Sequence, residues 1–388
     1  MASNVPAFLL PAPEPRTELG RYRILSSTAG VRLSPLCLGA MSFGTVLSSI
    51  MGSVDEEKAF QLLDAYTEAG GNFIDTANNY QNEESETFIG NWMQFQNNRD
   101  LLFIATKFSS NYRSWELGSG KTVNYAGNHK KSLFLSVEAS LKKPKTSYID
   151  LLYVHWWDWT TSIEELMDSL HILIEQGKVL YLGASDTPAW IVSAANVYAR
   201  AHGKTPFSVY QGRWNVMLRD FEQEIIPMAR QFGMALVPWD VLGEGKLQTK
   251  KQIELRKAAG EGLRSMWGPD QTDTERKASE VLEKVAHDIG VDSIQQVALA
   301  YVMHKARNVF PLIGGRKVEH LQDNIGALRL HLSDKHIQAI ESFQPFDVGF
   351  PSNVTGEDPK ETGLTPITLS TSAQIAWQRA GKPIGKDN

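Results

Sequence analysis

Four residues with acid–base side chains lie at or just beyond the ends of short apolar segments. Asp75 ends one segment, Lys107 lies near the end of the next, His155 ends a third, and Tyr80 follows Asp75 after a short loop. A buried lysine needs a charge partner, which a carboxylate on the neighbouring segment can supply. The ammonium would lower the pKa of a nearby phenol, and a neutral imidazole could hydrogen-bond the same substrate oxygen. The four residues together are typical of a general acid–base site with a tuned proton donor.

Three further apolar segments also run into polar residues: Ser185 and Asp186, Gln211, and Asp240. Taken singly, each position has a structural explanation, because an aspartate can cap a turn and a lone histidine is commonly a hydrogen-bonded core residue. Polarity repeated at the ends of six segments is better explained by a common functional rim.

Eight short apolar runs alternate along the chain with amphipathic stretches of helical period. The runs are Leu36–Gly39, Asn72–Asp75, Leu102–Phe108, Ile149–His155, Val179–Ser185, Ser208–Gln211, Ala235–Asp240 and Val309–Ile313. The helical stretches include Asp55–Ala69, Ser162–Gln176 and Asp220–Phe232. This alternation predicts an α/β fold of the (β/α)8 TIM-barrel type, in which active sites lie at the C-terminal ends of the strands. A doubly wound sheet is the alternative, but no G-x-G-x-x-G follows the first strand.

The segments outside the regular units divide the chain into three parts. These are an N-terminal arm of residues 1–20, a barrel of residues 21–343, and a C-terminal tail of residues 344–388 that packs on the barrel and could reach the site. Tyr22–Ser34 is expected to form a β-hairpin that plugs the bottom of the barrel. The long loops Ser109–Lys131, after the third strand, and Gly243–Asp273, after the seventh, are expected to wall a pocket.

Composition excludes several kinds of partner. The 388 residues carry a formal net charge of −5, which gives no electrostatic reason to bind nucleic acid or an anionic membrane. No apolar stretch approaches the roughly 20 residues of a membrane span. The single cysteine, Cys37, leaves no intramolecular disulfide and suits a reducing compartment, so we expect a cytoplasmic protein. The histidines are scattered and no metal-binding motif is present, so we predict no metal site.

The chain resembles the aldo-keto reductases at the four acid–base positions. The motif from Asp75 to Tyr80, DTANNY, is similar to the family's D-T-A-x-x-Y, and the segments ending in Lys107 and His155 are similar to its lysine and histidine strands. More narrowly, residues 314–321 and 345–351 resemble the fungal aryl-alcohol dehydrogenases, a branch that includes norsolorinic-acid-reductase-like proteins. The resemblance implies a carbonyl reductase in which Tyr80 is the proton donor and hydride comes from the nicotinamide C4.

The resemblance also implies NADP(H) as the cofactor. The family holds the nicotinamide carboxamide with a Ser-Asn pair and a Gln, to which Ser185-Asp186 and Gln211 correspond. Asp186 departs from the family's Asn. An ionised carboxylate only accepts hydrogen bonds, so Asp186 would accept from the carboxamide NH2 or leave the contact to Ser185 and Gln211. Trp239 occupies the position where the family stacks an aromatic ring on the nicotinamide, although a tryptophan near a strand end is at least as often a core residue.

Segments after the seventh and eighth strands resemble the family's phosphate-binding parts. Glycines before a helix N-terminus make a natural phosphate site, and two added cations would favour a 2′-phosphate and therefore NADPH over NADH. The residues expected near the pyrophosphate and the adenosine are Leu242, Gly243, Gly245, Lys246, Gly314, Arg316, Lys317, His320 and Asn324.

Three tryptophans, Trp156, Trp157 and Trp159, follow His155 directly. An additional core layer could explain them, but their position at the rim favours an aromatic pocket wall for an aryl substrate. The expected partner is thus a small-molecule aldehyde or alcohol.

Two other functions are compatible with parts of this pattern. One is a cofactor-binding regulatory subunit on the same barrel, like the potassium-channel β subunits of the family. The other is a barrel hydrolase, which Asp75 and His155 alone would permit but which leaves Tyr80 and Lys107 unexplained.

Overall fold

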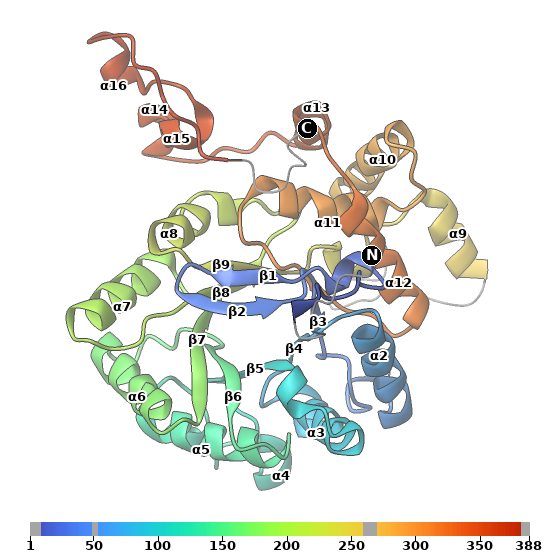
Figure 1. The fold of residues 1–388 in the computed structure, drawn as a ribbon, viewed down its shortest axis with the longest axis vertical. Coiled ribbons are helices and arrows are strands. Elements are labelled where there is room, and N and C mark those ends of the chain that lie inside the picture. The colour runs from blue at the N-terminus through green and yellow to red at the C-terminus, as the bar shows by residue number, and fades with distance from the viewer. Residues whose placement is uncertain (1–8, 49–52, 259–269, 382–388) are drawn as a thin grey trace.

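Eight parallel strands form a closed barrel (Figure 1). The structure, a computed structural model, describes residues 9–48, 53–258 and 270–381. The sheet order is β10-β3-β4-β5-β6-β7-β8-β9, and a parallel bridge between Leu236 of β9 and Val309 closes the ring. The strands are β3 (Cys37–Gly39), β4 (Phe73–Asp75), β5 (Phe103–Phe108), β6 (Ile149–Val154), β7 (Val179–Ser185), β8 (Val209–Arg213), β9 (Ala235–Trp239) and β10 (Leu312–Ile313). The predicted (β/α)8 fold is confirmed.

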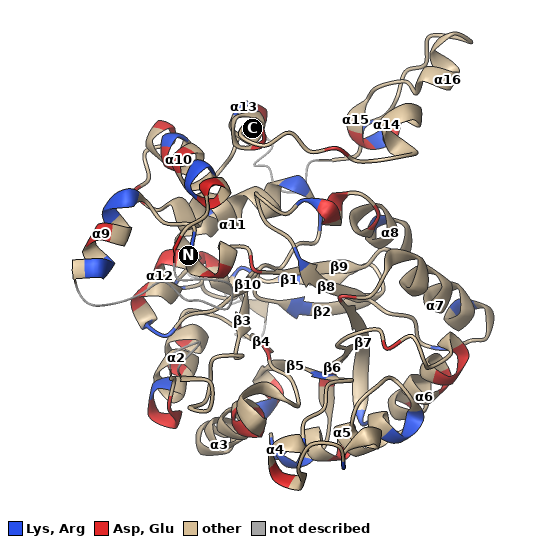
Figure 2. Ribbon diagram, turned by 180° about the vertical axis from the view of Figure 1, so that it is seen from behind, with Lys and Arg blue, Asp and Glu red and all other residues tan. Residues whose placement is uncertain are grey.

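Amphipathic helices surround the barrel, and several of them begin at polar caps. Asp55 caps α2 by accepting from the backbone N–H of Lys58, and Ser162 caps α6 by accepting from that of Glu165. The helices that alternate with the strands are α2 (Glu56–Glu68), α3 (Glu84–Gln96), α5 (Lys130–Lys142), α6 (Ile163–Glu175), α7 (Ala189–Ala201), α8 (Ile225–Phe232), α10 (Asp273–Asp288), α11 (Ile294–Lys305) and α12 (Val318–Gly326). Charged residues of both signs are spread over these outer helices (Figure 2).

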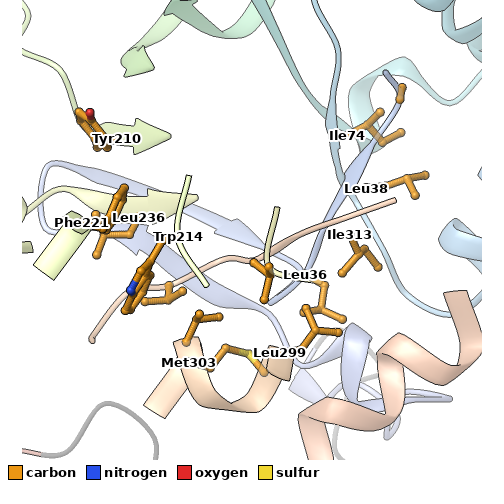
Figure 3. Close-up of a cluster of buried hydrophobic side chains, with 14 of the residues drawn as sticks. Leu36, Leu38, Ile74, Tyr210, Trp214, Phe221, Leu236, Leu299, Met303 and Ile313 are labelled. Atoms are coloured by element: carbon orange, nitrogen blue, oxygen red, sulfur yellow. The ribbon is translucent and has the colours of Figure 1, made fainter. Parts of the chain in front are cut away.

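The main core lies between the barrel and its helices. Leu299 and Met303 of α11 lie beside barrel residues such as Leu36 (Figure 3). A second cluster fills the barrel interior, where Phe73 and Phe103 meet edge to face at 5.4 Å. A short parallel strand of a barrel is buried on both faces. Its side chains therefore contribute to both core layers.

An antiparallel hairpin closes the N-terminal end of the barrel. It consists of β1 (Arg23–Ser26) and β2 (Ala29–Leu33), and it lies across the barrel strands in Figure 1. Leu25 and Leu33 are fully buried in the interior cluster with Phe73 and Phe103, which begin their strands. The predicted hairpin is therefore present at the barrel bottom, and the other end remains for the catalytic side chains.

Both predicted long loops contain short helices. The loop after β5 holds α4 (Ser114–Leu117) and a 3-10 turn at Val123–Tyr125. The loop after β9 holds a 3-10 turn at Gly243–Gly245 and α9 (Lys250–Ala258), and its residues 259–269 lie outside the described part.

The C-terminal tail projects beyond α8 (Figure 1). It follows α13 (Asp334–Glu341) and contains α14 (Ser352–Thr355), α15 (Pro359–Thr362) and α16 (Ile367–Ser370). Glu361 forms ion pairs with Arg230 at 3.4 Å and with Arg307 at 3.0 Å. Both arginines precede barrel strands, so these contacts lie at the hairpin end of the barrel rather than at the catalytic end.

Candidate active site

A buried ion pair joins the ends of β4 and β5. Lys107, with no exposed side-chain surface, donates to Oδ1 of Asp75 and to the backbone oxygen of Thr76, the latter at 2.8 Å. Gln211 donates to Oδ2 of Asp75 at 2.9 Å, so both carboxylate oxygens are engaged. Burial lowers the pKa of Lys107, but Asp75 and Tyr80 outweigh it and raise this pKa above its ordinary value. The lysine is thus held as an ammonium in an apolar setting.

Tyr80 faces this ion pair from the loop after β4. Its ring centroid lies 5.1 Å from Lys107 Nζ and 5.8 Å from the ring of His155, with the two rings edge to face. Burial raises the pKa of Tyr80 above its ordinary value, and Lys107 only partly opposes this effect. Lys107 lowers this pKa as expected, but the desolvation of the phenol, which the sequence does not reveal, has the larger effect. Tyr80 therefore keeps its proton at neutral pH, as a proton donor requires.

The backbone directly after Tyr80 is strained. Gln81, Asn82 and Glu83 have φ values of +51°, +50° and +78°. Residues other than glycine rarely adopt this region, and they do so where surrounding contacts impose it. The Gln81 side chain supplies such contacts by donating to the Met41 oxygen at 3.1 Å and accepting from the Leu47 amide at 2.9 Å.

His155 completes the cluster as a neutral imidazole. Burial and the nearby Lys107 ammonium hold its pKa well below the usual range. Its Nδ1 lies 3.3 Å from Ser110 Oγ, and its ring stacks on Trp156 with centroids 4.9 Å apart. Four residues from three separate segments thus meet at the C-terminal end of the barrel, where a phenol and an imidazole can act on one substrate oxygen.

The residues predicted to hold the nicotinamide also come together. Asp186 accepts hydrogen bonds from Trp239 Nε1 at 3.2 and 3.1 Å and from Ser185 Oγ at 3.2 Å. Burial raises the pKa of Asp186 to about 6. Gln211 was also expected to bind the carboxamide. Its side-chain nitrogen donates to Asp75 instead, which leaves the Gln211 side-chain oxygen as the available acceptor.

The loop after β9 turns through left-handed residues. Gly243, Glu244 and Gly245 have φ values of +57°, +56° and +84°. This conformation favours glycine, which occupies two of the three positions. The turn begins at Leu242, and Glu244 donates its amide to Asp240. The amine of Lys246, expected at the pyrophosphate, lies 3.4 Å from Glu275 of α10 and is 5% exposed.

A cationic corner follows β10. Gly314, Gly315, Lys317 and Asn324 line one small cavity at the start of α12. Arg316 and Lys317 are exposed beside it. Burial, together with Arg256 of α9 and Lys317, lowers the pKa of His320. Backbone N–H groups at a helix start and several cations form a donor set that fits a phosphate.

Sequence reasoning missed three residues of this region: Ser110, Gln81 and Arg256. Ser110 and Gln81 lie in loops with no periodic pattern, although each is adjacent to or within three positions of a predicted site residue or strand end. Arg256 lies on a helix that was expected only as loop.

Within residues 9–48, 53–258 and 270–381, no cluster of three or more His, Cys, Asp or Glu side chains could hold a metal ion. Within the same ranges no helix is both long enough and apolar enough to span a membrane.

Comparison with known proteins gives the family. The model of the Aldo/keto reductase family matches residues 35–345. The chain is 56% identical over 375 residues to "Aldo-keto reductase ausK" of Aspergillus calidoustus, covering 97% of this chain and 95% of that protein. It is 52% identical over 354 residues to "Aryl-alcohol dehydrogenase [NADP(+)]" of Phanerodontia chrysosporium, covering 89% and 92%. It is also 52% identical over 365 residues to "Norsolorinic acid reductase" of Aspergillus flavus, covering 94% and 92%. With its closed barrel and its buried cluster of Asp75, Tyr80, Lys107 and His155, the chain belongs to the aldo/keto reductase family.

Proposed function

We propose that this protein is an NADP(H)-dependent oxidoreductase that interconverts aryl or closely related aldehydes and their primary alcohols. The observation that carries the proposal is the convergence of Tyr80, Lys107 and His155 on one end of the barrel. In the reducing direction one hydride and one proton are added across the carbonyl bond. The bound nicotinamide would supply the hydride to the carbonyl carbon.

The proton comes from the chain itself. Tyr80 gives its phenolic proton to the carbonyl oxygen, and Lys107 favours the phenolate that results. His155, neutral at physiological pH, orients the same oxygen through a hydrogen bond. Asp75 keeps Lys107 in place and compensates its charge at this buried position.

The cofactor assignment rests on the corner after β10. Arg316 and Lys317 add exposed positive charge where a 2′-phosphate would distinguish NADPH from NADH. Ser185, Asp186, Gln211 and Trp239 would hold the nicotinamide side. The similarity to the aryl-alcohol dehydrogenase [NADP(+)] of Phanerodontia chrysosporium supports this choice.

The aryl preference rests on the tryptophans that follow His155. Trp156 stacks on His155, Trp157 meets Trp159 at 6.5 Å, and Trp159 meets Trp190 of α7 at 6.4 Å. Trp159 and Trp190 are 68% and 61% exposed, and Trp159 has a φ of +61°. A large exposed ring in a strained backbone conformation is more consistent with ligand contact than with core packing.

The test is a comparison of benzaldehyde with cyclohexanecarbaldehyde, which has the same ring size without aromatic character. NADPH consumption should be faster with benzaldehyde, and Trp159→Leu should reduce kcat/KM for benzaldehyde about two- to tenfold with a smaller effect on the saturated compound. Trp377→Leu, in the tail, serves as the control. No turnover of either aldehyde, with NADPH still bound, would instead support a regulatory subunit. Cell fractionation would test the cytoplasmic location that we include in the proposal.

A further inference from the structure

One serine hydroxyl links the imidazole of the catalytic cluster to the neighbouring indole. Ser110, in the loop after β5, has its Oγ 3.3 Å from His155 Nδ1 and 3.2 Å from Trp156 Nε1. The mechanism proposed above makes no use of Ser110. Its two contacts are nevertheless the only hydrogen bonds of this hydroxyl within the described part of the chain.

The chemistry of the three groups constrains the direction of both hydrogen bonds. An indole N–H only donates, so Ser110 Oγ accepts from Trp156. His155 Nδ1 is the protein acceptor within reach of the Ser110 hydroxyl hydrogen. The opposite arrangement, with Nδ1–H donating to Ser110, would place two donors on Oγ and turn the hydroxyl hydrogen away from the protein.

We propose that Ser110 is a positioning residue that fixes His155 as its Nε2–H tautomer, so that the ring presents a donor to the substrate oxygen. Nδ1 becomes the acceptor from Ser110, and the neutral ring carries its one hydrogen on Nε2. No hydrogen bond from Nε2 to a described residue is present, so this donor is available to a ligand. The opposite tautomer would present a lone pair to the carbonyl oxygen and repel it.

Contacts around Ser110, His155 and Trp156 fix the relative positions of the three side chains. Trp156 stacks on His155 at an interplanar angle of 16°, which fixes the plane of the imidazole. Ser109, the residue before Ser110, accepts at Oγ from the His155 amide at 3.3 Å and from Asn128 Nδ2 at 2.8 Å. The loop after β5 is thereby attached to His155 through both its backbone amide and its ring.

The inference rests on the proposed role of His155, but its test does not require turnover. Protein labelled with 15N-histidine is studied by long-range 1H–15N correlation, and the His155 signals are assigned by their loss in His155→Asn. The wild-type protein should show a protonated Nε2 and an unprotonated, hydrogen-bonded Nδ1. In Ser110→Ala the Nδ1 resonance should move to the position of a nitrogen without a hydrogen bond. A protonated Nδ1 in the wild type, or an Nδ1 resonance that Ser110→Ala leaves unchanged, would overturn the proposal.

Kinetics of the same variants supply the second readout. Ser110→Ala should lower kcat about two- to tenfold with NADPH affinity unchanged, and Ser110→Thr, which keeps the hydroxyl, should restore it. Equal losses in Ser110→Ala and Ser110→Thr would contradict an effect of the hydroxyl. If the spectra are as expected but no aldehyde is reduced, the proposed function fails while the tautomer assignment stands.

Discussion

Trp239 donates from its indole nitrogen to both carboxylate oxygens of Asp186, at 3.2 and 3.1 Å. Asp186 follows β7 and Trp239 ends β9, so the contact spans the end of β8 and fixes the orientation of the indole. Family resemblance alone suggested that Trp239 stacks on the nicotinamide. The structure shows in addition that the indole N–H is hydrogen-bonded to the carboxyl group of Asp186. Burial raises the pKa of this carboxyl group to about 6.

We predict that Asp186→Asn stabilises the protein above pH 6. The pKa of Asp186 is higher in the folded protein than its ordinary value of 3.8, so folding favours the protonated form. The favourable contribution is complete below pH 3.8 and is lost as the pH rises through 6, where the charged group must be buried. Urea unfolding at pH 8 should give Asp186→Asn a higher free energy of unfolding by about 1–3 kcal/mol, and the gain should shrink toward pH 4.

Asp168→Asn is the control for this prediction because its shift has the opposite sign. Hydrogen bonds from Tyr198 and Lys204 lower the pKa of Asp168, so its removal should not stabilise the protein at pH 8. A gain for Asp186→Asn that is the same at all pH values would mean that the stabilisation does not come from the carboxylate charge.

Tyr80→Phe should lower kcat for aldehyde reduction about 10²–10⁴-fold, because it removes only the transferable proton. The phenyl ring should keep the packing near Lys107 and His155, and NADPH affinity measured by quenching of tryptophan fluorescence should stay near wild type. Turnover above about a tenth of the wild-type value would exclude Tyr80 as the proton donor.

Lys107→Met should shift the pH profile of alcohol oxidation to higher pH. Oxidation needs the phenolate of Tyr80, and the Lys107 ammonium is the charge that lowers the pKa of that phenol. The single variant also leaves the buried carboxylate of Asp75 without its partner, so we expect a loss of about 3–5 kcal/mol in stability. The double variant Asp75→Asn/Lys107→Met should recover much of this stability without recovering activity. An unchanged pH profile in Lys107→Met would contradict the proposed role of Lys107.

Replacing both cations after β10, as Arg316→Ala/Lys317→Ala, should weaken NADPH at least about tenfold and change NADH little. The difference should shrink at high salt because both side chains are exposed and their attraction is screened. Fluorescence titration with each cofactor measures the effect, and Lys335→Ala on α13 is the matched control. Equal weakening of both cofactors would place these cations at the shared pyrophosphate instead of the 2′-phosphate.

The sequence predicted the fold well because the barrel depends on backbone-level patterns. Each apolar run became a strand, and Asp75, Lys107 and His155 met because parallel strands bring their C-terminal ends to one rim. The pattern was equally informative for the hairpin, in which buried Leu25 follows exposed Ile24 and buried Leu33 follows exposed Arg32.

What could not be predicted depends on side-chain direction and desolvation. Three features arise only when distant residues are packed together. They are the hydrogen bond from Gln211 to Asp75, the bridge through Ser110 and the net pKa shift of Tyr80. Helix α9 was missed because Lys250–Ala258 has no buried residue and hence no apolar stripe.

The hairpin that closes the bottom of the barrel separates two kinds of evolutionary constraint. Leu25 and Leu33 seal the interior at one end, whereas Tyr80 and the tryptophans after His155 lie in loops at the other. Substitutions at the closed end affect folding alone. Substitutions in the loops at the open end change which compounds can bind. Proteins with this framework can therefore change the carbonyl compound that they bind without destabilising the barrel.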